Sequence, residues 1–327
     1  MLPPGSSLDT HVLPLAPWDS VLLVTDGLFE GRVRADAPDR LGFDGFLVTP
    51  TGMPYRFVHL QTGHIRDSIN NPAEIGTLMM EFGKLSRLTG DNRYYELAKK
   101  AIMEVYKRRS RIGLVGEQID VTTGKWVSTQ SHISGYIDSY YEYLFKSWKL
   151  FGDKDFLDAF QTHNKAIRKY LLDRTPNGCF MRHTDMNTGK GSATLYGALD
   201  AFYAGLCAYA GDIKTAEFIQ QANYYMWTHF NIEPEEFDYK KDSITSAYYV
   251  LRPENLESCF YLYRLTKKDK YCWQAQRMVN DILTHCKNET GFASLPVTWI
   301  RMPSVAWAVF SAAVGPVIVA VAEAVQL

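Results

Sequence analysis

One short turn, a glycine followed by an aspartate between two apolar segments, recurs along this chain and constrains its fold more than any other feature. It stands at Gly90-Asp91, Gly152-Asp153 and Gly211-Asp212, and a fourth turn keeps only Asp269. Glycine adopts the left-handed conformation that ends a helix, and an aspartate carboxylate accepts hydrogen bonds from the free amides that begin the next one. Each turn therefore predicts a helical hairpin.

The four aspartates are evenly spaced, at intervals of 62, 59 and 57 residues (91 to 153, 153 to 212 and 212 to 269). From residue 72 onward, apolar residues return every three or four positions, as in amphipathic helices. Repeated hairpins stack side by side because a single hairpin cannot bury its own apolar face. We expect an all-α fold, an α/α toroid with one helical layer enclosed by another, because both helices of several repeats are strongly apolar. An open solenoid is the alternative.

Composition fits a globular protein and excludes some partners. The chain has 327 residues, 46% of them hydrophobic, which is ample for a core. Its 35 basic and 36 acidic residues leave a formal net charge of -1, so no whole-molecule field favours nucleic acid. The sequence contains no glycine-rich phosphate loop, His-Glu-x-x-His motif or Gly-x-Ser-x-Gly motif.

Two end segments depart from the helical repeat. Residues 1–48 form a divergent N-terminal segment without a visible signal peptide, and residues 49–302 hold the expected toroid domain. The apolar segment 303–327 includes a run, 303–325, with a single charge, long enough to span a membrane. Because Gly315 and Pro316 interrupt this run, we predict that it packs against the edge of the toroid, with a membrane anchor as the alternative.

Acidic residues in apolar surroundings are the candidate catalytic groups, because a glycosidase places two carboxyl groups across its sugar pocket. Glu74 and Glu81, at positions i and i+7 of an apolar segment, are expected on one face of a single helix. Carboxyl groups on such a face are seldom buried without a partner or a function. Asp138 stands at the start of a tyrosine-rich helical segment, where it could equally be an N-terminal cap.

A second acidic group, Glu254 and Glu257, follows Arg252-Pro253. Proline suits the first position of a helix, so these acids could simply complement the helix dipole. Arg252 favours a catalytic role, because a cation beside clustered carboxylates can hold one of them ionised as a base. The tyrosine clusters at 140–143 and 261–263 could stack on sugar rings, although aromatic residues in helices more often belong to the core.

Several segments, taken in order from about Thr49 to Ser294, resemble glycoside hydrolase family 47. This family comprises the class I α-1,2-mannosidases and the ER-degradation-enhancing mannosidase-like proteins. The most specific matching stretches are residues 49–55, 138–144 and 251–258. The stretch 200–206 lacks a histidine of the glycan-processing subgroup, and so looks more like the ER-degradation-enhancing branch or a bacterial relative.

The resemblance implies a ring of seven helical hairpins around a central pocket. It also implies an inverting mannosyl-oligosaccharide 1,2-α-mannosidase activity, with the catalytic carboxyl groups far enough apart to hold a water molecule. It places Asp138 and Glu254 on the carboxyl groups that act on this water, and Glu235 on a further acidic position of the catalytic site. The substrate-binding positions that it implies are Arg252, Glu74, Glu81 and Glu257.

The chain also departs from the family pattern. Residues 1–48 contain no match to the family's general-acid motif, and the threonine that binds Ca²⁺ in the family is not found. We therefore assign no metal ligands and expect Ca²⁺, the family's cofactor, to contribute little to stability. Seven hairpins of this size would need about 420 residues, so we expect an incomplete ring.

These departures leave three functions open. The first is an impaired α-1,2-mannosidase, the second a mannose-glycan-binding protein without catalysis, and the third a non-functional fragment. The implied partner is a mannose-containing oligosaccharide or glycoprotein. The implied location is the secretory pathway and its endoplasmic reticulum, or the bacterial periplasm or exterior.

Overall fold

The computed structural model describes residues 49–57, 64–289 and 291–295. Helices dominate this part of the chain, and short strands connect them. The first half contains β1 (Ile69–Asn70), α2 (Pro72–Gly76), α3 (Met79–Thr89), α4 (Arg93–Lys107), β2 (Gln118–Asp120), β3 (Trp126–Ser128), β4 (Gln130–Ser131), α5 (Asp138–Phe151) and α6 (Lys154–Tyr170). The second half contains β5 (Leu172–Thr175), β6 (Gly178–Met181), β7 (His183–Asp185), β8 (Gly191–Ala193), β9 (Leu195–Gly197), the 3-10 helix η1 (Leu199–Ala201), α7 (Phe202–Tyr209), α8 (Ile213–Phe230), β10 (Glu236–Asp238), β11 (Ser243–Ser246), α9 (Glu254–Thr266), α10 (Lys270–His285), β12 (Lys287–Asn288) and β13 (Gly291–Phe292).

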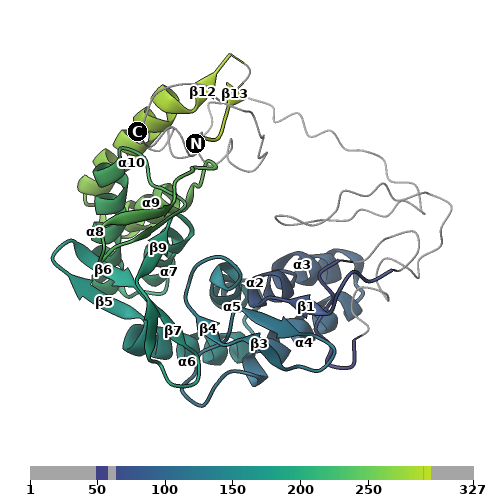
Figure 1. Cartoon of the computed structure of the whole chain (residues 1–327). Helices are drawn as coiled ribbons and strands as arrows, with labels where there is room; N and C mark the ends of the chain where they lie inside the picture. The colour runs from purple at the N-terminus through teal and green to yellow at the C-terminus, as the bar shows by residue number, and fades with distance from the viewer. Residues whose placement is uncertain (1–48, 58–63, 290, 296–327) are drawn as a thin grey trace, which may run out of the picture.

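The helices form hairpins that follow one another around an arc, from α3 and α4 to α9 and α10 (Figure 1). Figure 1 places α5, α7 and α9 toward the inside of the arc and α6, α8 and α10 toward its outside. The helices α7 and α9 pack against each other, and α5 packs against α2 and α3. This is the two-layer arrangement predicted from the repeat. The predicted incompleteness of the ring stays a prediction, because it depends on residues outside the described part.

The inner helix α7 shows why the layers form. Every residue from Phe202 to Ala208 is buried, as expected of a helix that is apolar all round. Gly205 lets α9 approach closely, since its N–H donates to Ser258 Oγ at 2.8 Å and an added Cβ would lie 3.1 Å from the same oxygen. The outer helix α8 instead buries only part of its surface.

The turns between paired helices follow the predicted chemistry, with two corrections. Gly90, Gly152 and Gly211 have left-handed φ angles of 75°, 77° and 92°. The Asp153 and Asp212 side chains accept amide hydrogen bonds at the N-termini of α6 and α8. The capping position of α4, however, is Asn92; the preceding residue, Asp91, still accepts a hydrogen bond from Arg93 N–H. In the fourth turn Lys267 takes the left-handed conformation, with φ 57°, and Asp269 makes no side-chain capping bond.

Five small antiparallel sheets lie within the described residues, with strand orders β1-β2-β3, β11-β10-β9, β12-β13, β4-β7-β8 and β5-β6. Their strands are two to four residues long. So short a strand leaves no alternating pattern in the sequence, which is why only helices were predicted. These sheets lead into the inner helices: β4 precedes α5, β9 precedes α7, and β10 with β11 precedes α9.

One predicted helix is wrong. Glu74 and Glu81 do not share a continuous helix, because α2 ends at Gly76 and α3 begins at Met79. The break follows the short helix α2, which the Asn71 side chain and Pro72 begin. The predictions for residues 1–48 and 303–325 lie outside the described residues. Among the helices that are described, none is both long and apolar enough to cross a membrane.

Candidate active site

Asp138 is the first residue of α5, and its carboxyl group lies at the entrance of this inner helix. Ser139 donates to Asp138 Oδ1 twice, from its amide at 2.7 Å and from its hydroxyl at 3.2 Å. Burial raises the pKa of Asp138 to about 6 in spite of these donors. The Asp138 carboxyl group can therefore exchange a proton near neutral pH.

Glu254 occupies the corresponding position at the start of α9, with Pro253 at the capping position rather than inside the helix as predicted. Its Oε2 atom is buried and has no hydrogen-bond partner in the part of the chain that the structure describes. Burial, together with the negative charges of Glu257 and Asp138, raises the pKa of Glu254 to about 8. At neutral pH the Glu254 carboxyl group is therefore mostly protonated.

Arg252 lies beside these groups but pairs with Glu235. Its Nε and one terminal nitrogen donate to the two Glu235 oxygens at 3.0 and 2.5 Å, a bidentate ion pair. Glu235, Glu254 and Asp138 all raise the pKa of Arg252, against the effect of burial. Arg252 lowers the pKa of Glu254, but burial outweighs this attraction. That Arg252 holds one of the clustered carboxylates ionised as a base stays a prediction.

Glu257, one turn into α9, belongs to a group that joins two inner helices. Lys146 Nζ on α5 lies 2.5 Å from Glu142 Oε1 and 3.6 Å from Glu257 Oε1. Burial and the Glu142 charge raise the pKa of Glu257 to about 7, and Lys146 opposes them. Lys146 thus holds α5 and α9 together beneath the entrances where Asp138 and Glu254 stand.

Glu74 and Glu81 are held by other partners. Glu74 forms a 2.7 Å ion pair with Arg56, and Glu81 accepts a hydrogen bond of 2.9 Å from Tyr143. The second oxygen of Glu81 is buried without a hydrogen-bond partner among the described residues. The structure therefore groups Asp138, Glu254, Arg252, Glu235 and Glu257 electrostatically, and no described interaction ties Glu74 or Glu81 to them.

Two buried acids of this region were missed by reasoning from the sequence. Asp200, 1% exposed, accepts Gly197 N–H at 2.9 Å, and burial raises its pKa to about 8. Glu233 is fully buried, accepts a hydrogen bond from Asn255 at 2.8 Å, and burial raises its pKa well above the usual range. Asp200 could have been found, because it is a lone acid beside the apolar run 201–208. Glu233 is one of three acids within 233–236, and no pattern distinguishes it.

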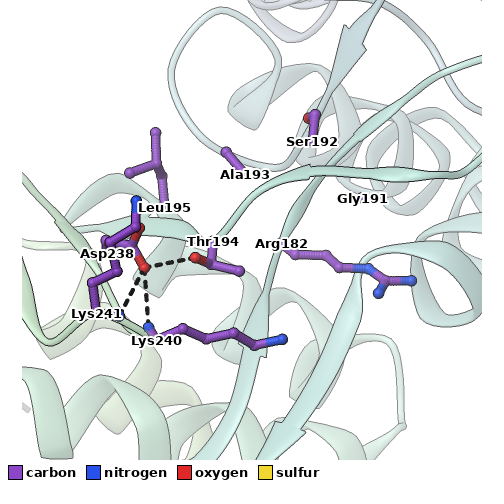
Figure 2. Close-up of a pocket in the computed structure, with 9 residues that line it drawn as sticks. All are labelled: Arg182, Gly191, Ser192, Ala193, Thr194, Leu195, Asp238, Lys240 and Lys241. Carbon is purple, nitrogen blue, oxygen red and sulfur yellow. Dashed lines mark hydrogen bonds and ion pairs between the residues drawn. The ribbon is translucent and has the colours of Figure 1, made fainter.

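A surface hollow of about 580 Å³ lies elsewhere, between β8, β9 and the turn after β10 (Figure 2). Figure 2 shows Thr194 and the backbone of Lys240 and Lys241 converging on Asp238, whose Oδ1 atom accepts all three hydrogen bonds. These donors help to lower the pKa of Asp238 to about 2, against burial. This acid is thus fixed as a structural anion, and the hollow contains none of the predicted site residues.

The family model described as "Glycosyl hydrolase family 47" matches residues 39–298. The chain belongs to this family. It is 33% identical to alpha-mannosidase I MNS5 of Arabidopsis thaliana over 89% of its own length and 50% of the relative's. It is 38% identical to ER degradation-enhancing alpha-mannosidase-like protein 2 of Mus musculus, over 76% of its own length and 43% of the relative's.

A solved structure gives the same fold. The α-1,2-mannosidase from Trichoderma reesei superposes with a TM-score of 0.68 at 23% identity, covering 79% of this chain and 64% of that one. The predicted α/α toroid is thereby confirmed. This family 47 chain spans about half the length, or less, of the two curated relatives named above.

Calcium is the remaining element of the family 47 pattern. Within the described residues, no group of three or more His, Cys, Asp or Glu side chains is placed to hold a metal ion. Ca²⁺ prefers six to eight oxygen ligands, and the described acids do not supply such a set. The acids of the described residues therefore do not by themselves form a Ca²⁺ site. The small contribution of Ca²⁺ to stability stays a prediction.

Proposed function

We propose that this chain is a glycoside hydrolase that removes α-1,2-linked mannose from N-glycan-type oligosaccharides. One observation carries the proposal: Asp138 and Glu254 open two inner helices, and both act electrostatically on Arg252. Two carboxyl groups of unequal acidity at one site are what glycoside hydrolysis needs. The family and the α-1,2-mannosidase with the same fold support the choice of substrate.

The different pKa values give the two carboxyl groups different roles in the reaction. Asp138, with a pKa of about 6, is mostly ionised at pH 7 and takes a proton from the attacking water. Glu254, with a pKa of about 8, stays protonated and donates a hydrogen bond that orients this water. The water oxygen bonds to the anomeric carbon as the glycosidic bond breaks. Residues 1–48 contain no match to the family's general-acid motif, so we assign no residue of this chain to the proton that the leaving oxygen takes up, and we propose that turnover by this chain alone is slow.

The proposal is tested by measuring mannose release from Man-α-1,2-Man. Asp138→Asn and Glu254→Gln each remove a titratable group with little change of shape, and we expect release to fall by about 10²- to 10⁴-fold. Glu96→Gln, on the exposed face of the outer helix α4, is the matched control and should keep full activity. Equal rates in all four proteins would contradict the proposal.

A second candidate function is glycan binding without hydrolysis, and the missing general-acid motif favours it. Calorimetry with Man-α-1,2-Man separates the two. Binding without mannose release would assign the chain as a mannose-glycan-binding protein. If the chain neither binds Man-α-1,2-Man nor releases mannose from it, the remaining assignment is a non-functional fragment.

We extend the proposal to location. Relatives of this chain are named ER degradation-enhancing proteins, which supports a place in the secretory pathway and its endoplasmic reticulum. The proposed partner there is a glycoprotein that carries mannose-containing oligosaccharides. Fractionation of cells that express the full-length protein from its own gene tests this location, and recovery in the cytosol would contradict it.

A further inference from the structure

A buried polar cluster of Glu117, His132 and His183 lies next to the entrance of α5. His132 is 3% exposed and His183 is 6% exposed. The strands β4 and β7 pair with Ser131 opposite Thr184, a register that brings His132 opposite His183. Their rings stack with centroids 4.3 Å apart and an angle of 26° between the planes. None of these three residues belongs to the cluster of acidic residues around Arg252.

Hydrogen bonds fix the tautomer of His132. The backbone N–H of Ser134 donates to His132 Nδ1 at 3.2 Å, so this nitrogen must keep its lone pair. The ring proton is therefore on Nε2, which donates to Glu117 Oε2 at 3.0 Å. Ser128 Oγ donates to the other Glu117 oxygen at 3.0 Å. The hydrogen bond from His132 is the largest cause that lowers the pKa of Glu117, so this acceptor is a carboxylate.

The groups around His132 keep it in this state. His183, stacked on one face, is neutral because burial lowers its pKa to about 3, and Gln130 Nε2 donates to its Nδ1 atom at 2.7 Å. Glu117 approaches Nε2, and the Ser134 amide approaches Nδ1. A proton on Nδ1 would face the Ser134 N–H donor, so the backbone requires Nδ1 to act as an acceptor.

The same peptide segment holds Asp138. The Ser134 carbonyl oxygen accepts hydrogen bonds from the Ile137 and Asp138 amides at 3.1 and 3.0 Å. His132 therefore binds the N–H of Ser134, and the carbonyl of Ser134 binds the first residue of α5.

We propose that His132 is a positioning residue for Asp138, because it accepts the Ser134 N–H, holds the turn that presents the Asp138 carboxyl group, and is itself oriented by the Glu117 carboxylate. The catalytic part of this inference rests on the proposed function of Asp138. Its structural part, the coupling of one imidazole to the entrance turn of α5, does not.

Three variants of His132 separate its two hydrogen bonds. In His132→Asn, the side-chain oxygen can accept Ser134 N–H in an Asx-type turn, while the contact with Glu117 is lost. In His132→Gln, the side-chain amide NH₂ can still donate to Glu117, but the side-chain oxygen lies too far from the backbone to accept the Ser134 N–H. His132→Leu removes both bonds. Glu96→Gln on α4 is again the matched surface control.

The first readout does not depend on turnover. Hydrogen exchange of the Ile137 and Asp138 amides should be at least about tenfold faster in His132→Leu and His132→Gln, and within about twofold of wild type in His132→Asn. The ¹³C titration midpoint of the Asp138 carboxyl group should move in the same two variants and stay in His132→Asn. If His132→Leu does not fold, the exchange rates of His132→Gln and His132→Asn are compared instead, and faster exchange in His132→Gln alone supports the inference.

The second readout is mannose release from Man-α-1,2-Man. We expect kcat to fall about tenfold or more in His132→Leu and His132→Gln with KM changed less than twofold, because a small displacement of a catalytic group acts mainly on the chemical step. His132→Asn should recover most of the activity. The inference is overturned if the Ile137 and Asp138 amides exchange at the wild-type rate in all variants. It is also overturned if His132→Asn and His132→Gln lose the same amount of activity. No turnover by the wild type, with the exchange pattern as expected, overturns the proposed function and leaves the coupling to Ser134 standing.

Discussion

The entrances of α5 and α9 are built alike and differ in how they hold their carboxyl groups. Asp138 and Glu254 are each the first residue of an inner helix, and in neither helix does a side chain cap the N-terminus. Each entrance also contains a non-glycine residue in the left-handed region, Tyr136 with φ 74° and Leu251 with φ 64°. The helix dipole favours the ionised form at both sites by about 0.3–1 kcal/mol.

The difference lies in local hydrogen bonds. Asp138 accepts two donors from Ser139, whereas one oxygen of Glu254 is buried without a partner among the described residues. Their pKa values are raised to about 6 and about 8. Burial therefore outweighs the dipole at both entrances. Asp138 ionises first, since Ser139 gives its carboxylate two hydrogen bonds, whereas Glu254 has one from its own backbone N–H and the charges of Glu257 and Asp138 beside it. The order of ionisation cannot be read from the position of an acid in its helix.

The largest expected effect is on the pH dependence of hydrolysis. We expect kcat/KM to rise as pH passes about 6, where Asp138 ionises, and to fall as pH passes about 8, where Glu254 loses its proton. Outside this window the rate should change about tenfold per pH unit. Mannose release between pH 4 and 10 measures it. A rate that keeps rising through pH 8 would reverse the roles and make Glu254 the base.

Removing the cation between the two entrances should have the next largest effect. In Arg252→Met, Glu235 loses its bidentate partner while its side chain stays mostly buried, which costs about 1–3 kcal/mol of unfolding free energy. Without this positive charge the pKa of Glu254 should rise further. Arg252→Lys keeps the charge but not the paired geometry, so it should lose stability and leave the pH profile nearly in place. Urea unfolding and the pH profile measure the two effects separately. Identical pH profiles for Met and Lys would show that the charge of Arg252 does not act on Glu254.

Some of this arrangement could be predicted from sequence. The glycine and aspartate turns gave the hairpins because their chemistry is local, and the acids at 138 and 254 were found because they begin apolar helices. The break between Gly76 and Met79 was missed, because Glu74 and Glu81 keep helical spacing across it. The spacing of apolar residues does not reveal a break of two non-helical residues when the helices on both sides of it share one apolar face.

The partners of each charge were less predictable. Arg252 is two residues from Glu254 in sequence, yet it pairs with Glu235, which lies on another segment. The pairing of β9 with β10 begins directly after Glu235, with Gly197 opposite Glu236, and positions that segment. Strands of three residues leave no sequence signal, so neither this sheet nor the ion pair beside it could be predicted.

A third prediction concerns stability and tests whether burial governs the acids of this region. The pKa of Asp200 is raised from 3.8 to about 8, so the folded state binds a proton that the unfolded state releases. This contribution to stability is fully present below pH 3.8 and is lost as pH rises through about 8. This one proton should make the unfolding free energy of the wild type fall by about 1.4 kcal/mol per pH unit between pH 4 and 8. In Asp200→Asn this part of the fall should be absent. Asp158→Asn, on the exposed face of α6, is the control. Parallel curves for wild type and Asp200→Asn would show that Asp200 ionises normally.

The smallest expected effect concerns the left-handed residue at the Asp138 entrance. Tyr136 is 45% exposed, so removing its ring costs little burial, whereas its φ of 74° is unfavourable for any residue with a Cβ. Comparing Tyr136→Gly with Tyr136→Ala isolates the backbone, because both variants lose the ring and only alanine keeps the Cβ. Relief of about 1–2 kcal/mol of strain is partly offset by the greater freedom of glycine in the unfolded chain, about 0.4–1 kcal/mol. We therefore expect the glycine variant to be more stable than the alanine variant by about 1 kcal/mol in urea unfolding. If alanine is equal or better, the entrance of α5 stores no strain, and the resemblance between the two entrances ends at their carboxyl groups.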